Sequence, residues 1–421
     1  MKNFGTLYRY ELKKLLLRKL SWVAVMLLAV FCAYSVFSRG PATTMGGTLP
    51  VIDENGNETG EGRYISGKEI YATYLKSAGI LDGRVMDDEL FQEMLENLPN
   101  LDGLELDVYF WTEDATYLSV YSMVNGLFAN PRSVTAEEFY AVQWEQTQLY
   151  LNNYGVEREG LSEGEKEYWT EQAAKIEKPF IYQDPWRGTT YLTDFFYVLL
   201  GLLPVAAAVC VCTVFSEDRR TRMDALVFST QESRLPLYLA KVLAGIITAA
   251  LAGVVIVGTT VAAHLAVWGA KGFDACIQMY MIALPRAITV GQMFLIMSVL
   301  LVLYTVLCGG ITMLIAAITR SSIAALAVPV LLVQILDRFR SVPYGWAAYL
   351  PDNLISLNGM WNVKLVNIFG VYLNNFQFGP LLYLAITMLL LALCWLGWRR
   401  SAARGSRNLI KQLHTTVIKI L

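Results

Sequence analysis

Long apolar windows without charge are the main pattern along this chain. Five of them are clear, and each is close to the roughly 20 residues that an α-helix needs to cross the hydrocarbon core of a membrane. They cover residues 20–37, 195–215, 242–263, 287–319 and 381–398. A sixth window, residues 321–336, is short for a span and contains Pro329. The pattern predicts an all-α polytopic membrane protein.

Basic residues decide whether the sixth window also spans. They gather in three segments: the amino end, the loop after the second span and the carboxyl-terminal tail. With six spans all three segments lie on one side, as the positive-inside rule expects of cytoplasmic segments, whereas with five the tail lies opposite. We therefore predict six transmembrane helices with both termini in the cytoplasm. The residues concerned are Lys2, Arg9, Lys13, Lys14, Arg18, Lys19, Arg219, Arg220, Arg222, Arg234, Lys241 and those of the tail, 399–421.

A polar block between Arg39 and Thr190 separates the first two windows. It holds 27 Asp and Glu against 11 Lys and Arg, a net charge of −16; the whole chain carries −2, so the rest carries +14. Such a split is typical of a long extracytoplasmic insertion. We predict an acidic extracellular domain at 39–190. A cleaved signal peptide at 1–40 is disfavoured, because the apolar core exceeds the usual length of about 7 to 15 residues and lacks a clear cleavage site.

Within this block, residues 40–62 are rich in Gly, Thr and Pro and indicate a linker or loop. The pattern then becomes helical, and the run from Ser133 to Glu137 is a good helix start with an acidic first turn. We expect four or five helices, ending near Pro179. The many scattered carboxylates single out no acid–base pair. They form either a solvated acidic surface or a docking face for a cationic ligand such as a basic peptide.

Cysteine and histidine are placed where neither a disulfide framework nor a metal site is expected. Five of the six cysteines lie inside the apolar windows, and no CxxC pair occurs. His264, near the outer end of a span, and His414, in the tail, are expected to be interfacial or solvated rather than ligands.

The amino end predicts a helix that lies along the membrane surface. Phe4, Leu7, Tyr8, Leu12 and Leu15 share one apolar face. The polar residues of the same stretch are Arg9, Glu11, Lys13 and Lys14. An interfacial helix over 1–19 that leads into the first span, 20–38, follows from this rhythm. A basic flank without helix is the alternative.

The loop after the second span carries the most specific pattern. A Phe-x-Glu, a run similar to Leu-Leu-x-Ser-Thr, an Arg and a Lys at the head of the next helix occur in this order. The residues are Phe215-Ser216-Glu217, Leu226-Val227-Phe228-Ser229-Thr230, Arg234 and Lys241. This arrangement resembles the membrane subunit of an ABC transporter of the ABC type 2 permease family. The stretch from Leu7 to Leu16 resembles the amino-terminal elbow helix of that family.

The resemblance covers residues 1–38 and 191–400 and leaves the acidic insertion out. Members often have a Gly-Thr pair after the Glu, where this chain has Thr221-Arg222. The family implies a coupling helix in this loop that docks on a separate ATP-binding subunit, present in two copies, and a second permease subunit, identical or similar. The residues expected to meet the ATP-binding subunit are Glu217, Asp218, Arg219, Arg220 and Arg222. A loop whose charges only set the topology is the alternative.

ATP chemistry is not expected in this chain itself. It lacks the Gly-x-x-x-x-Gly-Lys-Ser/Thr phosphate loop, so ATP and Mg²⁺ should be bound by the partner subunit. No catalytic residue, metal site or nucleic-acid-binding function is predicted. We expect a multi-pass subunit of a bacterial cell membrane.

The expected cargo is an amphipathic or hydrophobic substrate such as a peptide, drug or lipid. Charges are nearly absent from the windows, whereas ion carriers place ionisable groups near the midplane. An exporter is the favoured function. The alternative is a receptor or sensor whose acidic domain binds a ligand and signals inward. The expected organisation is an elbow helix at 1–19, spans at 20–38 and within 191–398, a coupling loop at 216–236, an outer loop at 337–380 and a basic cytoplasmic tail at 399–421.

Overall fold

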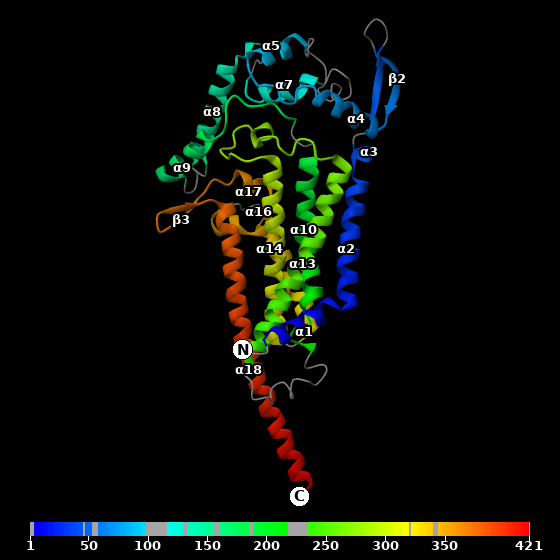
Figure 1. Ribbon diagram of the computed structural model, residues 1–421, viewed down its shortest axis with the longest axis vertical. Helices are drawn as coiled ribbons and strands as arrows, with labels where there is room; N and C mark the ends of the chain where they lie inside the picture. The colour runs from blue at the N-terminus through cyan, green and yellow to red at the C-terminus, as the bar shows by residue number, and fades with distance from the viewer. Residues whose placement is uncertain are drawn as a thin grey trace.

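The computed structural model is an elongated helical molecule with a bundle in the middle and a smaller helical layer at one end (Figure 1). Its described residues are 4–44, 47–52, 58–97, 116–128, 133–154, 160–184, 188–217, 234–319, 321–339 and 344–420. Helices dominate, as predicted. The strands in the described part form two antiparallel hairpins.

Five helices of the bundle are long and apolar enough to cross a membrane. They correspond to the five clear windows of the sequence, although α13 begins well before its window and so shortens the expected coupling loop. The five are α2 (Lys19–Ser38), α10 (Gly188–Val211), α13 (Arg234–Trp268), α14 (Val290–Thr319) and α18 (Asn375–Ile420), the last with its apolar part at Asn375–Arg399. This confirms a multi-pass membrane protein.

The sixth predicted span forms a shorter helix. α15 (Ser322–Leu336) has 15 residues, contains Pro329 and packs against α14 and α10. A helix of that length rises only about 22 Å, less than the roughly 30 Å of the hydrocarbon core. It is followed by the short helices η4 (Asp337–Phe339), η5 (Gly345–Tyr349), α16 (Pro351–Leu354) and α17 (Leu357–Trp361), and then by β3 (Val366–Ile368) and β4 (Val371–Leu373). The six-span topology stays a prediction.

Close packing without large side chains holds α13 and α14 together. A Cβ added to Gly309 of α14 would lie 2.9 Å from the Cβ of Ala249, and one added to Gly253 of α13 would lie 2.9 Å from Oγ1 of Thr305. In lipid, helices associate through such close packing, because exclusion of water no longer drives them together. The glycines therefore serve the helix contact.

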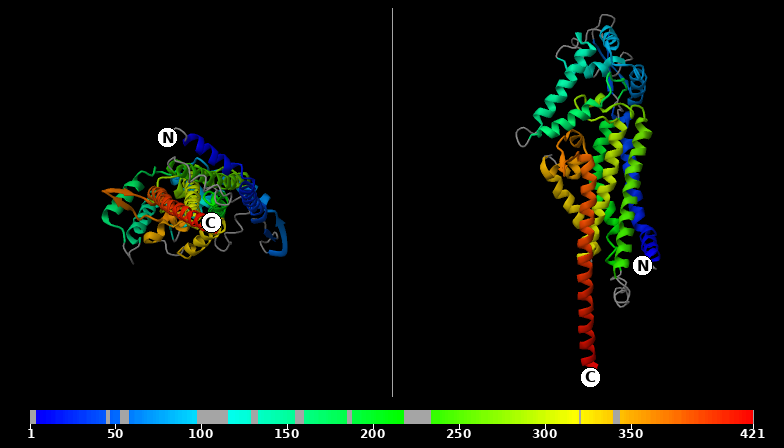
Figure 2. Two further views of the ribbon diagram at one scale, coloured as in Figure 1. Left: turned by 90° about the horizontal axis from the view of Figure 1, so that it is seen from below. Right: turned by 60° about the vertical axis from the view of Figure 1, so that its left-hand side comes forward.

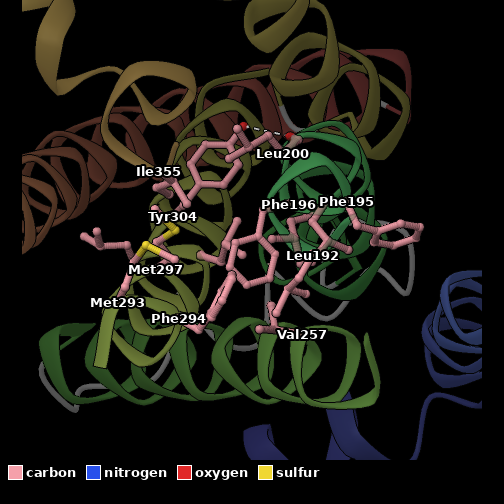
Figure 3. Close-up of a cluster of buried hydrophobic side chains, with 14 of the residues drawn as sticks. Leu192, Phe195, Phe196, Leu200, Val257, Met293, Phe294, Met297, Tyr304 and Ile355 are labelled. Carbon is pink, nitrogen blue, oxygen red and sulfur yellow. Dashed lines mark hydrogen bonds between the residues drawn. The ribbon is translucent and has the colours of Figure 1, made fainter. Parts of the chain in front are cut away.

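An apolar cluster fills the space between α10, α13 and α14. Figure 3 shows Leu192 and Phe196 of α10 meeting Phe294 of α14 and Val257 of α13. Nearby, the hydroxyl of Tyr304 donates to the carbonyl oxygen of Leu200 at 3.1 Å. The interior between these three helices is thus filled by side chains.

The polar block forms a helical layer on one end of the bundle, which we call the apical end (Figure 1). Its elements are α4 (Gly67–Ala78), α5 (Asp88–Asn97), α7 (Leu118–Asn125), α8 (Ala136–Asn153) and α9 (Glu163–Ala174). The expected helix start near Ser133 is confirmed: Thr135 caps α8 in a capping box with Glu138. The layer is rich in helix, as predicted.

The interpretation of residues 40–62 as a linker is wrong. They contain the short helix α3 (Pro41–Thr44) and much of a hairpin, β1 (Gly47–Ile52) and β2 (Glu58–Ile65). Several of the Gly and Pro residues that suggested a loop lie within the strands, where Pro50 pairs with Gly62. The pairing with a second strand supplied what local composition could not indicate.

His264 is buried, so the prediction of an interfacial or solvated side chain is wrong. Its Nδ1 lies 2.9 Å from the carbonyl oxygen of Thr260, and its ring packs against Phe195. Packing against α10 explains the burial, because Phe195 belongs to that helix. Contacts between helices therefore decide the exposure of a helix end.

Candidate functional site

The helix α1 (Phe4–Leu16) lies across the end of the bundle opposite the apical layer, which we call the basal end (Figure 1). Three residues of its predicted apolar face, Tyr8, Leu12 and Leu15, pack against the bundle core. Glu11 is buried beside them. A carboxylate on the packed side of a helix needs a partner, because an isolated buried charge is costly.

The partner of Glu11 is Lys241 of α13. Its Nζ lies 2.8 Å from Oε1 of Glu11, and the two residues are only 1% and 7% exposed. A buried ion pair is costly to break, because the remaining charge then has no counterpart. This contact ties α1 to the first turns of α13.

A second ion pair joins α1 to the segment directly after α10 (Gly188–Val211). Nζ of Lys14 lies 3.5 Å from Oε2 of Glu217, and both side chains are about a quarter exposed, 25% and 26%. Close by, Arg18 donates to the hydroxyl of Thr213, and Ser21 donates to the carbonyl oxygen of Val209 at 3.2 Å. The turn between α1 and α2 is therefore fastened to the last turns of α10.

Other helix ends meet at the same place. The hydroxyls of Ser216 and Ser322 lie 2.6 Å apart, which joins the segment after α10 to the start of α15. Tyr238 of α13 donates to the carbonyl oxygen of Leu391 in α18. The rings of Phe215, Tyr238, Trp395 and Trp398 pack together. We call the whole set the basal junction: Glu11, Lys14, Arg18, Thr213, Ser216, Glu217, Tyr238, Lys241 and Ser322.

The residues predicted from the sequence have different outcomes here. Glu11, Lys14 and Glu217 come together in the basal junction, whereas Arg9 and Lys13 are exposed on α1. Asp218, Arg219, Arg220 and Arg222 lie outside the described residues. Their predicted contact with an ATP-binding subunit stays a prediction. The Glu11–Lys241 pair was missed, although a single Lys in an otherwise apolar helix is a signal for a buried partner.

A second charged site lies at the apical end, around Arg286 in the connection between α13 and α14. This residue is buried, 5% exposed. Its Nε donates to the carbonyl oxygen of Met360 at 3.0 Å. Its Nη2 donates to the carbonyl oxygen of Asn362 at 2.7 Å and to Oδ1 of Asn375 at 2.8 Å. Arg286 thereby fixes α17 and the start of α18 against the connection that precedes α14.

Two aromatic rings enclose the Arg286 guanidinium. Its Cζ lies 4.6 Å from the centre of the Trp169 ring and 4.9 Å from that of Phe376. Burial lowers the pKa of Arg286 to about 10, which still leaves it charged at neutral pH. Within the described part of the chain, its hydrogen-bond acceptors are all neutral oxygens. The faces of two aromatic rings and the dipoles of neutral oxygens therefore stabilise this cation in place of a carboxylate.

Helix α9 is bound to the same segment. Nε1 of Trp169 donates to the carbonyl oxygen of Val363 at 2.5 Å. The carboxylate of Glu165 accepts from the amide of Leu365 at 2.9 Å and from Nζ of Lys364 at 3.0 Å. Burial acts to raise the pKa of Glu165, but hydrogen bonds, led by those from the Leu365 and Ser162 amides, outweigh it and leave this pKa lowered.

Helix α8 adds contacts from its carboxyl-terminal end. The hydroxyl of Tyr154 donates to Oδ1 of Asn362 at 2.9 Å, and that of Tyr150 donates to the carbonyl oxygen of Trp361. Burial raises the pKa of Tyr154 to about 12, so the hydroxyl remains a donor at physiological pH. We call this set the apical junction: Tyr150, Tyr154, Glu165, Trp169, Arg286, Asn362, Lys364, Asn375 and Phe376.

Nothing in the sequence indicated the apical junction. Arg286 stands one residue before an apolar window, where a flanking Arg is usually solvated, so its position did not indicate burial.

Gly62, Gly67 and Lys68 have the spacing of a phosphate loop, Gly-x-x-x-x-Gly-Lys, but their role is structural. Gly62 of β2 pairs with Pro50 of β1, Ser66 caps α4, and Glu69 stands where a phosphate loop has Ser or Thr. No loop separates strand from helix there, so these residues form no phosphate cradle.

Comparison with known proteins identifies one family. A family model described as "ABC-2 family transporter protein" matches residues 6–369 of the 421-residue chain. The matched range runs from α1 through the acidic block to the turn of the β3–β4 hairpin. It therefore includes the acidic insertion, which the sequence resemblance leaves out, and ends before residues 370–400, which the resemblance includes. No curated protein and no solved structure matches.

Proposed function

We propose a function for this chain from one premise: it belongs to the ABC-2 family of transporter proteins. Members are the membrane components of ABC transporters and do not hydrolyse ATP themselves. The chain is accordingly a permease subunit that associates with an ATP-binding subunit. Family membership favours this function over a receptor or sensor. Two ATP-binding subunits and a second permease, identical or similar, complete the proposed transporter.

The basal junction is the proposed receiver of motion from the ATP-binding subunit. The observation that supports this is the meeting of α1, α13, α15 and the segment after α10 around Glu217, a residue of the predicted coupling loop at 216–236. Lys14 joins α1 to Glu217 of this loop, and Glu11 and Lys241 join α1 to α13, the helix at its other end. A displacement of the loop would therefore reach α1 and, through α1, α13. In this arrangement α1 acts as the elbow helix.

Copurification tests this function. We expect a P-loop ATPase encoded next to this chain to copurify with it. Reversing the charges of Glu217 and Arg220 together should abolish the association. The isolated chain should hydrolyse no ATP. A matched control reverses Arg84 and Glu93, an ion pair of 3.1 Å in the apical layer. Robust hydrolysis by the chain alone, or association unaffected by the basal reversal, would contradict the proposal.

The orientation follows from the charge distribution. We infer six spans, both termini in the cytoplasm and the acidic layer outside the cell. Cysteines introduced at Glu96 and Glu163, both exposed, should react with an impermeant thiol reagent on intact cells. Cysteines at Ser216 and Ser401 should not. Labelling of the Ser401 position from outside would show that α15 does not cross.

An amphipathic cationic peptide is the cargo that the charges favour, with transport directed outward. The apical layer exposes many carboxylates, which attract cations over roughly the Debye length of 8 Å at physiological salt. The exposed residues include Glu89, Glu96, Glu137, Glu145, Glu163, Glu167, Glu171 and Glu177.

Neutralising four of these carboxylates tests the cargo proposal without disturbing the fold. We choose Glu96, Glu145, Glu167 and Glu171 for replacement by Gln, because none of them caps a helix through its side chain. Deleting the whole layer would be a poorer test, since the deletion would also remove the Trp169 ring that packs on the buried Arg286 guanidinium. Cells carrying the variant should lose protection from cationic peptides while membrane insertion persists. Unchanged protection would contradict the proposal that the cargo is a cationic peptide.

A further inference from the structure

The hairpin β3–β4 turns through an unfavourable residue. Ile368 pairs with Val371, so only Phe369 and Gly370 form the turn, and both have positive φ, 51° and 88°. A two-residue turn with positive φ at both positions favours Asn-Gly. Phenylalanine at its first position is disfavoured, because its Cβ approaches the following carbonyl oxygen in the left-handed conformation. The presence of Phe369 at this position therefore needs an explanation from its surroundings.

The side chains at the turn are apolar and exposed. Phe369 is 104% exposed, more than in an extended reference chain, and Ile368 and Val371 are exposed beside it. No residue of 365–374 carries a charge. Tyr372, on the other side of the hairpin, packs against the cluster around Trp169. A Cβ at Gly164 of α9 would collide with the Tyr372 ring. The hairpin is therefore supported by α9 and presents its turn outward.

The position of the hairpin identifies what covers this turn. It projects sideways from the bundle at the head of α18, below α9, and its tip is level with the first turns of α18 (Figure 1). The view from below shows the tip outside the outline of the bundle (Figure 2). The next exposed side chains along the chain are those of α18, first Gln377 and then Leu381 and Leu384, and the two leucines belong to an apolar span. The apolar tip thus continues the surface that faces lipid.

The other hairpin has the opposite chemistry. Its strand β2 contains Glu58, Glu61 and Arg63, and it stands on the apical layer away from α18 (Figure 1). A second copy of the chain is a poorer occupant for the β3–β4 tip, because stable protein interfaces bury about 20–30 residues a side. The three exposed apolar side chains of this turn are too few for such an interface.

We propose that Ile368, Phe369 and Val371 insert into the lipid at the apical membrane surface. The partner is the headgroup–acyl boundary of a lipid bilayer, where aromatic side chains are enriched in membrane proteins. The absence of charge in the turn makes this insertion independent of anionic lipid. Through Tyr372 the inserted tip supports α9, so the apical layer is held at a fixed height above the membrane. This inference needs neither the cargo nor the ATP-binding subunit.

Spin labels measure the insertion directly in the full chain, reconstituted in phosphatidylcholine nanodiscs. A Cys276→Ser background leaves five native cysteines, all buried. One label is placed by Phe369→Cys and a matched control by Tyr64→Cys, a 67% exposed aromatic of β2. Collision with oxygen reports lipid, and collision with Ni-EDDA reports water. We expect the label at 369 to be several-fold less accessible to Ni-EDDA and more accessible to oxygen than the label at 64.

A neighbouring reporter separates the contribution of Phe369 from that of the label. A label introduced by Val371→Cys should become more accessible to Ni-EDDA when Phe369→Asn is added. Asparagine suits the turn, so the hairpin should be retained and the Tm in detergent unchanged or raised.

Three outcomes would overturn the proposal. Equal Ni-EDDA accessibility at 369 and 64 would place the tip in water. Low accessibility to both probes, with dipolar coupling between labels, would place it against a second copy. An unchanged signal at 371 after Phe369→Asn would mean that Phe369 does not anchor the hairpin.

Discussion

The basal and apical junctions each bury one cation, and they stabilise it in opposite ways. At the basal end Lys241 lies 2.8 Å from the carboxylate of Glu11. At the apical end Arg286 donates to two carbonyl oxygens and one amide oxygen, between the rings of Trp169 and Phe376. One junction is neutral as a pair, whereas the other retains a net charge stabilised by dipoles and ring faces.

This difference bears on how each end can rearrange. An ammonium is a point charge on a flexible stem and tolerates changes of direction, whereas a guanidinium binds through a fixed planar set of donors. The basal contact can thus persist while α1 and α13 shift relative to each other. The apical contact depends on three oxygens and two rings remaining in place. Motion transmitted through the bundle should therefore begin at the basal end, with the apical junction acting as its rigid counterpart.

Removing Arg286 should give the largest loss of stability. Arg286→Met leaves three buried oxygens without a donor, which costs about 3–5 kcal/mol in total. Arg286→Lys should also destabilise, because an ammonium cannot match the planar donor set. The free energy of unfolding, measured by SDS titration in mixed micelles, checks both. Arg84→Met, in an ion pair about a third exposed, is the control and should change it little. A Lys variant as stable as wild type would mean that charge alone matters.

The basal pair should be costly to break singly and cheap to remove as a pair. Lys241→Met leaves Glu11 buried without its partner, at a cost of about 3 kcal/mol. The double variant Glu11→Gln/Lys241→Met should recover to within about 1 kcal/mol of wild type, because no charge remains. The same titration measures both. Additive losses in the double variant would show that the two residues act through separate contacts.

The sequence predicted the helices of the bundle better than their connections. Long uncharged windows report lipid exposure directly, so α2, α10, α13, α14 and α18 were located from composition alone. Contacts between distant segments have no such local signal. Glu11 meets Lys241 only because α1 folds back across the bundle, and Arg286 meets Asn375 only because α9 and α17 close over it.

Local composition also led to wrong predictions at two places where contacts between distant segments determine the structure. Gly and Pro suggested a linker at residues 40–62, but strand pairing between β1 and β2 gives these residues a fixed conformation. His264 near a helix end suggested solvent, but its ring is buried against Phe195 of α10. The family match spans both regions, but it does not specify which residues contact one another. Sequence therefore located the junctions less well than the helices they connect.

The pH dependence of the free energy of unfolding tests the role of Glu165 in the apical junction. Because its pKa is lowered in the folded protein, its ionised form stabilises the apical junction above the unfolded pKa of about 4.3, and this contribution fades as the pH falls through the folded value. Glu165→Gln should cost about 1–2 kcal/mol at pH 7, because the Leu365 amide and Lys364 lose a charged acceptor. Unfolding titrations at pH 7 and below pH 4 should show the difference shrinking. A constant difference would assign the effect to packing.

The exposed basal pair should give the smallest effect on stability. Lys14 and Glu217 are 3.5 Å apart and about a quarter exposed, 25% and 26%. Replacing either by Gln should cost less than about 1 kcal/mol, and the cost should decline in 1 M salt, where the Debye length is about 3 Å. A double-mutant cycle with both Gln variants measures the coupling between them. The functional effect is expected to be larger than this energy suggests, because Glu217 lies within the predicted coupling loop. In membranes containing the ATP-binding subunit, substrate-stimulated ATP hydrolysis should fall in both single variants and remain normal in Arg84→Gln, which alters an ion pair of the apical layer. Normal stimulation in all three would leave the basal junction a structural contact and remove it from the coupling route.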